Sequence, residues 1–188
     1  MYKNVYNHKM ILENDTGLFL CDETGKLLSY YPSVDVLIDK TEVREHYGYV
    51  FYRPCINSMK VPEGVTCLGR EFFRGGMISG SLELPDTLKK LGTETDDCVF
   101  ADTCIGSVTI PMSVDMIGTF AFGNSKINEL VYPDKIIECQ YLRQFKGAEI
   151  NDFVIHRDMF DFLQRSKQEV NSLLFYGASI ENIVVVEQ

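Results

Sequence analysis

The stretch SVTIPMSVDMIGTFAF, residues 107–122, is the clearest copy of a unit that recurs along this chain of 188 residues. In this unit a proline follows alternating apolar residues, a glycine comes seven residues after the proline, and a phenylalanine closes the unit. The proline recurs at Pro62, Pro85, Pro111 and Pro133, at spacings of 23, 26 and 22 residues. A pattern that repeats every few tens of residues is typical of a solenoid.

Apolar residues hold fixed positions around each proline. Three residues after it come Val65, Leu88, Val114 and Ile136, and six after it come Leu68, Leu91, Ile117 and Cys139. The alternating residues before the proline predict a short strand with one buried face. Proline at a strand end removes no donor that the ladder needs, and the glycines at 69, 92 and 118 permit a tight turn. We expect a parallel ladder whose strands end at Val61, Leu84, Ile110, Tyr132, Ile155 and about Val185.

A second landmark, Phe-x4-Ile, closes each unit. It begins at Phe51, Phe73, Phe100, Phe122, Phe145 and Phe175. These side chains are predicted to fill the interior below the next strand, because one unit cannot bury its own face and stacked units share a core. The register extends upstream to Val36 and Ile38, and downstream through residues 153–155 to residues 183–185.

Two units are longer than the others. Four extra residues lie between Gly92 and Phe100. After His156, the residues Met159, Leu163, Val170 and Leu174 have helical spacing, so we predict mostly helix from about Arg157 to Leu174. Insertions on one side of each repeat map to one face of a solenoid.

The first 35 residues lie outside the repeat. The apolar runs 19–21 and 27–30 flank Asp22-Glu-Thr-Gly-Lys26, which predicts a β-hairpin, and residues 10–12 add a further strand. Terminal units of solenoids are usually atypical because they cover the first rung. We therefore expect two parts, an N-terminal hairpin cap at 1–35 and a solenoid of about six units at 36–188, the last of them longer and helical.

The unit resembles the BspA-like leucine-rich repeats of bacteria and some protozoa. Residues 108–122 match the pattern of these repeats at nearly every position. The resemblance covers about residues 36 to 188. It implies an α/β-type repeat, a leucine-rich-repeat solenoid with a parallel β-sheet on its concave face. It also implies protein binding or a structural role, such as adhesion at a bacterial surface, and it supplies no catalytic residues.

The composition excludes several classes of protein. A formal net charge of −9 argues against a nucleic-acid partner, which would need clustered Lys and Arg. Apolar runs are too short to span a bilayer, and the first residues form no signal peptide. The chain as given predicts a cytoplasmic location, whereas the resemblance implies a secreted or surface protein.

Catalytic and cofactor motifs are absent from the sequence, and we expect no enzyme activity, no cofactor and no metal. His8, His46 and His156 are far apart. The alternative is a metal-dependent binder or enzyme that uses Asp96, Asp97 and Asp102 in the insertion at 93–104, although these residues lack the spacing of a calcium loop.

All six cysteines are expected to be free thiols. Cys55 and Cys104 share a column with Met77 between them. At about 4.8 Å per rung they lie about 10 Å apart, beyond the reach of a disulfide. Cys139 occupies an interior position and is expected to be a small core residue.

The candidate binding surface comes from the strand residues that face outward. The column two before the proline position and the column four before it meet on one sheet face. The residues predicted to bind a partner protein are Lys60, Glu83, Thr109, Glu129, Val131, Asp152, Val154 and Val184. The alternative explanation for the three valines in this set is β-propensity alone. The final strand at 183–186 is an open edge that predicts a homodimer through the C-terminal end; the helix from about Arg157 is the alternative cover for that edge.

Overall fold

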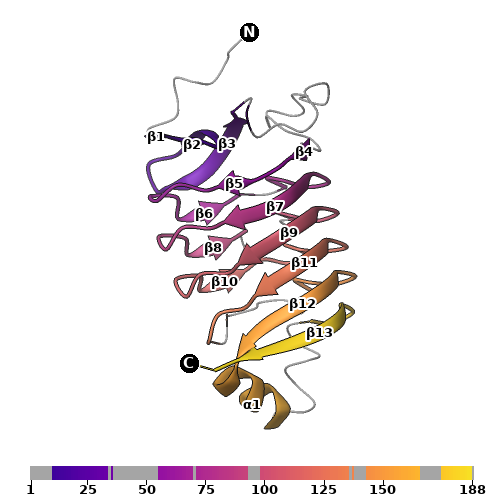
Figure 1. The fold of residues 1–188 in the computed structure, drawn as a ribbon. Coiled ribbons are helices and arrows are strands. Elements are labelled where there is room, and N and C mark those ends of the chain that lie inside the picture. Colours follow the sequence, from indigo (N-terminus) through magenta and orange to yellow (C-terminus); the bar gives the residue numbers. More distant parts are fainter. Residues whose placement is uncertain are drawn as a thin grey trace.

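The computed structural model describes residues 10–33, 35, 55–69, 71–92, 98–135, 137, 143–165 and 175–187. In these residues the chain winds as a solenoid whose strands stack rung upon rung in two sheets (Figure 1). The predicted solenoid is therefore confirmed. The positions of Val36, Ile38, Phe51 and Cys139 lie outside the described residues.

One sheet, which we call the long-strand sheet, carries the ladder predicted from the prolines. It contains β4 (Cys55–Ile56), β5 (Met59–Lys60), β7 (Met77–Glu83), β9 (Cys104–Thr109), β11 (Lys126–Val131), β12 (Glu149–His156) and β13 (Ser179–Val186). Every pairing within it is parallel. The ladder reaches the predicted strand ends, because the amides of Val61, Ile110 and Tyr132 each donate to the next rung at 2.9 Å.

A second sheet, the short-strand sheet, was not predicted. Its parallel rungs are β6 (Cys67–Leu68), β8 (Lys90–Leu91) and β10 (Met116–Ile117). The inward residues of these strands, Leu68, Leu91 and Ile117, are buried. Two residues are too few for the alternation that reveals a strand, so the sequence showed these positions only as recurring apolar residues.

The N-terminal hairpin is present, and it extends the short-strand sheet. β1 (Met10–Asn14), β2 (Gly17–Cys21) and β3 (Lys26–Pro32) pair antiparallel, and β3 then pairs parallel with β6. The hairpin also contacts the first described rung of the other sheet, because the Asn14 Nδ2 donates to the Lys60 carbonyl at 2.8 Å. Its own core is fixed by Tyr30, whose buried hydroxyl donates to the Thr16 carbonyl at 2.7 Å.

A column of phenylalanines fills the interior between the sheets. Phe73, Phe100, Phe122 and Phe145 are fully buried, and Phe175 is nearly so. Successive ring centroids lie 6.3, 5.4, 5.0 and 5.0 Å apart along this column. Offset or tilted rings at such distances add to the free energy of burial. The column explains why the phenylalanine recurs in each unit.

The turn after each of these five phenylalanines has a left-handed residue at a fixed position. Two residues past the ring, φ lies between +52° and +75° at Gly75, Asp102, Asn124, Gly147 and Gly177. Glycine, aspartate and asparagine are the residue types that tolerate this region. The glycine seven residues after the proline has no such common conformation, since φ is positive at Gly92 but not at Gly118.

The helix α1 (Arg157–Arg165) follows β12 directly, at the residue predicted for its start. Met159 is buried on its inner side and Phe162 is exposed. The rest of the predicted helix, residues 166–174, lies outside the described residues. In the described part of the chain, no helix has the length and apolar content of a membrane span.

Candidate functional site

The outer face of the long-strand sheet carries all eight residues that the sequence predicted for binding. The column two residues before the proline position runs along the whole sheet. It begins with the neighbours Lys60 and Glu83 and continues rung by rung through Thr109, Val131, Val154 and Val184. Glu129 pairs with Asp152 in the neighbouring column. The strand alternation therefore brings these side chains together as two adjacent columns on one surface.

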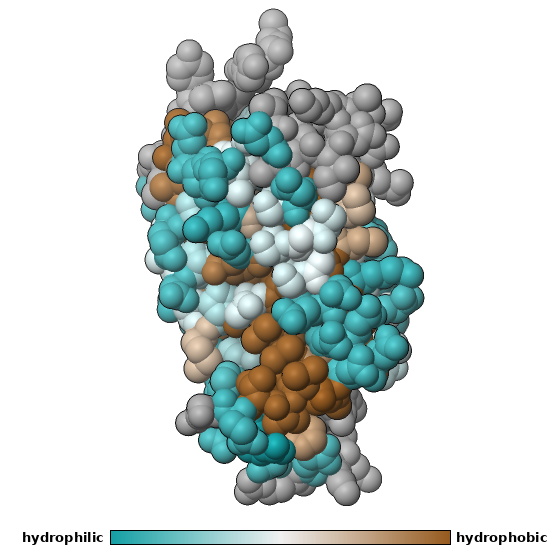
Figure 2. Space-filling view, in the orientation of Figure 1, coloured by the Kyte–Doolittle hydropathy of each residue, from teal (hydrophilic) through white to brown (hydrophobic). Residues whose placement is uncertain are grey.

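The two halves of this face differ in polarity. In the N-terminal half, the Lys60 ammonium lies 3.6 Å from the Glu83 carboxylate, with both side chains 58% exposed. In the C-terminal half, Val131 and Val154 are half-buried, and Val184 is exposed. Figure 2 shows apolar surface gathered over β11 to β13, whereas the surface over β7 and β9 is pale to teal. The valine column, Val131, Val154 and Val184, is the apolar part of the face.

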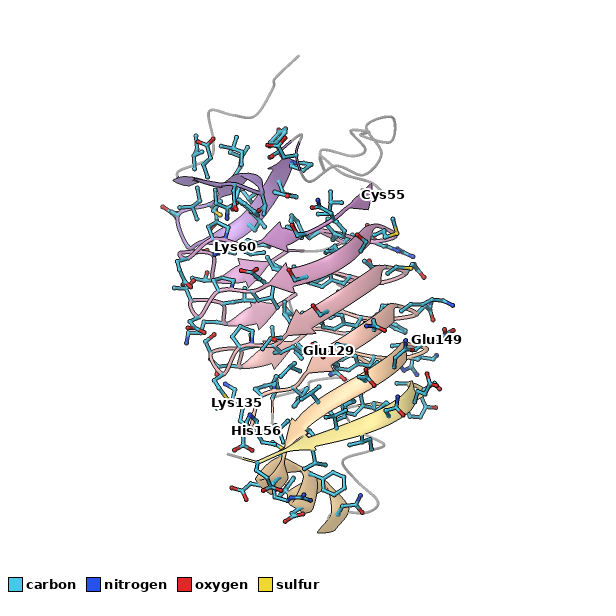
Figure 3. All side chains as sticks on the ribbon, in the orientation of Figure 1. Cys55, Lys60, Glu129, Lys135, Glu149 and His156 are labelled. Atoms are coloured by element: carbon cyan, nitrogen blue, oxygen red, sulfur yellow. The ribbon has the colours of Figure 1, made fainter. Side chains whose placement is uncertain are left out.

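Two acidic residues border the valine column, and neither forms an ion pair with a described residue. Glu129 forms no ion pair with any described residue, and Asp152 accepts a hydrogen bond from the Asn182 Nδ2 at 3.0 Å. Figure 3 places Glu129 in the middle of the sheet. Glu149, by contrast, forms an ion pair with the neighbouring strand, because its carboxylate lies 3.0 Å from the Lys126 ammonium. The pair Glu129 and Asp152 therefore concentrates negative charge next to the valines.

A shallow groove of about 300 Å³ was not anticipated from the sequence. It lies near the starts of β7, β9, β11 and β12, and its lining includes Gly106, Lys126, Asn128, Glu149 and Asn151. The Asn151 Nδ2 donates to the Asn128 Oδ1 at 3.1 Å. Glycine inside a strand often marks a close approach of two backbones. Gly106 signals the close approach of β9 to the Ser79 and Gly80 carbonyls of β7 rather than an empty side-chain position, so no feature of the sequence indicated the groove.

The BspA type leucine rich repeat region matches residues 44–162 in six copies. The chain belongs to this family. The matched range contains the strands β4 to β12 and the phenylalanine column from Phe73 to Phe145. No curated protein and no solved structure is similar enough to the chain to count as a match. Membership indicates a repeat-based interaction or structural role, and leucine-rich repeats are typically non-enzymatic.

The alternative site at the insertion is only partly described. Asp96 and Asp97 lie outside the described residues. Asp102 accepts hydrogen bonds from the Arg74 Nε and the Asn124 Nδ2, each at 3.2 Å, so its carboxylate already links two neighbouring turns of the BspA-type solenoid. Within the described ranges, no group of three His, Cys, Asp or Glu side chains could hold a metal ion. His8 and His46 also lie outside, and His156 ends β12 beside Val186.

The cysteine column is arranged as predicted. Met77 pairs with Cys55 on one side and with Cys104 on the other. Figure 3 shows Cys55 at the start of its strand, at the same edge as Glu149. The five cysteines within the described residues are free thiols.

Thiol reactivity should separate the cysteines in the folded protein. Cys21 is buried, and burial raises its pKa from 9.0 to about 11, with the Asp22 charge adding to the shift. We expect Cys104, which is exposed, to react rapidly with a disulfide reagent at pH 8 and Cys21 to react only on unfolding.

The raised pKa of Cys21 also makes stability depend on pH. Because the folded pKa is the higher one, the contribution of Cys21 to stability is present below pH 9 and falls as the pH rises towards 11.

The control for this experiment is the denatured, unreduced protein, in which all six cysteines should titrate. Finding two or more of them oxidised would contradict the prediction of free thiols and would support an extracellular location.

Proposed function

We propose that this protein binds another protein through the outer face of its long-strand sheet, and that its role is binding rather than catalysis. The observation that supports this proposal most directly is the valine column beside Glu129 and Asp152. A contiguous apolar patch rimmed by polar residues is typical of an interaction site. Repeat solenoids also use their extended sheet faces for binding.

The charges on this face indicate the chemistry of the partner. Glu129 and Asp152 are direct neighbours on adjacent strands, where like charges repel each other. A basic group on the partner would relieve this repulsion, and complementary charge favours association and orientation. Along each strand, Val131 lies two residues after Glu129, and Val154 lies two residues after Asp152. A partner segment with a basic residue two positions from an aliphatic one would match this spacing in an extended conformation.

The test is selection from a displayed library of random peptides, followed by measurement of binding to variants. We expect the selected peptides to combine Lys or Arg with an aliphatic residue at that spacing. Val154→Lys should weaken their binding about 30-fold, because loss of a central contact in an interface costs about 2 kcal/mol. Met112→Lys, at an exposed position outside the predicted binding residues, is the matched control and should change binding less than about twofold.

Selection of peptides whose binding is insensitive to Val154→Lys, or equally weakened by Met112→Lys, would refute this surface. A hydrogen–deuterium exchange map of the complex gives an independent location for the peptide. Protection should centre on β11 and β12.

A second proposed contact is a homodimer through the C-terminal edge strand. The observation that favours it is Ile183, whose side chain is 53% exposed although it continues the buried column of the preceding rungs.

A further inference from the structure

Exposed apolar side chains gather at the C-terminal end of the solenoid. Six large hydrophobic residues among those the structure describes are exposed, and four of them belong to the last rung or to α1. These four are Phe162, Tyr176, Ile183 and Val184. Large exposed apolar patches in a folded domain usually mark a surface that another molecule covers.

Ile183 shows that this exposure is a property of the rung's position. The same inward column contains Met59, Leu82, Val108, Leu130 and Phe153, each at most 2% exposed. Phe153 pairs directly with Ile183, which is 53% exposed. The difference arises because no described strand lies on the far side of β13.

The backbone of the ladder indicates which groups of β13 face that open side. In preceding rungs, the carbonyl of the outer-column residue accepts a bond from the rung before it, as Val154 accepts from the Tyr132 amide at 2.9 Å. Val184 occupies this column in β13. By the same pattern, the N–H and C=O groups of Val184 point towards β12. The N–H and C=O groups of Ile183 and Val185 therefore point to the open edge.

We infer that two copies of this chain pair through β13 in antiparallel register, with a two-fold axis at Val184. This register pairs Ile183 with the second copy's Val185 on the inner side, and it pairs Val184 with the second copy's Val184 on the outer side. The open backbone groups of Ile183 and Val185 then bond to each other across the axis. A register centred on Ile183 would instead place Asn182 opposite Val184 and Glu181 opposite Val185.

The ends of the strand also fit this arrangement. Antiparallel pairing places the start of one β13 beside the end of the other. Tyr176 lies three residues before the start of β13, and α1 lies beside its end, where the Arg157 Nη2 is 2.9 Å from the Glu187 carboxylate. Tyr176 therefore approaches the second copy's α1, which carries the exposed Phe162. The second copy's Arg157, which pairs with Glu187 in its own chain, supplies positive charge where that Glu187 meets Glu181.

The dimer would enlarge the proposed binding face, and in this respect the inference rests on the proposed function. Both long-strand sheets join into one sheet, so the valine column of one copy continues directly into that of the other. The resulting apolar strip has an acidic pair on each side of the axis. Such a surface fits a partner that presents two equivalent segments, since isologous interfaces are symmetric.

Cross-linking tests the register directly. Residues in a non-hydrogen-bonded antiparallel pair have Cα atoms about 4.5 Å apart, within the range of a disulfide. In a Cys104→Ser background, Val184→Cys should become a disulfide-linked dimer under mild oxidation. The matched control, Thr109→Cys, lies in the same column away from the axis and should remain monomeric on a non-reducing gel. Head-to-tail association would leave Val184→Cys without a link and would overturn the proposal.

Sedimentation tests the association itself with the full chain. Wild type should sediment at twice the 21.5 kDa mass of the chain, and Val184→Asp should weaken the dimer about 100-fold or more, because it buries like charges at the axis. A wild type that stays monomeric at high concentration would overturn the dimer. The outcome is separable from that of the peptide experiment, because Val154→Lys tests the face and Val184→Cys tests the edge.

Discussion

Replacement of Phe122 by alanine is expected to lower the free energy of unfolding by about 3–5 kcal/mol. Phe122 is fully buried and stacks between Phe100, at 5.4 Å, and Phe145, at 5.0 Å with the two rings almost parallel. The truncation removes ring contacts on both sides and leaves a cavity in the middle of the column. Denaturant unfolding of wild type and variant measures the loss.

Met112 provides the matched control, because it is a large apolar side chain in the same unit that is 56% exposed. Met112→Ala should change the free energy of unfolding by less than about 0.5 kcal/mol. A loss below about 1 kcal/mol for Phe122→Ala would show that the ring does not stabilise the column as described.

Gly106→Ala is expected to destabilise the fold by at least about 2 kcal/mol through overpacking. A Cβ at this position would lie 2.4 Å from the Ser79 carbonyl oxygen and 2.5 Å from that of Gly80. Both atoms belong to the backbone of the preceding rung, so relief of the clash requires β7 and β9 to separate. Thermal and denaturant unfolding measure the effect.

Thr109→Ala on the same strand is the comparison for this variant. Thr109 is exposed on the outer face, so its truncation should cost less than about 0.5 kcal/mol. Similar stabilities for Gly106→Ala and Thr109→Ala would contradict the close approach of the two rungs at Gly106.

The long-strand sheet could be predicted because its signals are local and repeated. Each strand has alternating apolar residues and a proline position just past its end, and the observed ends differ from the predicted ones by one residue. The short-strand sheet could not be predicted in the same way, because two residues carry no periodicity. The N-terminal hairpin was predicted from its turn, but its partner β6 depends on that second sheet.

The left-handed turn residues could have been predicted and were not. Two positions after the last five of the six recurring phenylalanines, the chain has only glycine, aspartate and asparagine, at Gly75, Asp102, Asn124, Gly147 and Gly177, whereas Arg53 follows Phe51. These residue types share a tolerance for positive φ rather than hydrophobicity or charge. A search for apolar spacing therefore passes over this column, although its residues have the left-handed conformation in all five of the described turns.

The candidate binding face follows from alternation, so the sequence placed its residues in the correct columns. What it could not supply is the environment of each side chain. The half-burial of Val131 and Val154 depends on neighbours in adjacent rungs, and so does the hydrogen bond between Asn182 and Asp152. The exposure of Ile183 depends on the absence of a described strand beyond β13, which the composition of the rung itself does not reveal.

The phenylalanine column has a consequence for how a chain of this kind can change length. Each ring contacts only the rings of the rungs next to it, so the unit that can be duplicated or deleted is one whole turn of the solenoid. Gain of such a turn lengthens the molecule by one strand spacing, about 4.8 Å, and leaves every column in register. Growth by complete turns is therefore the evolutionary path that this architecture favours.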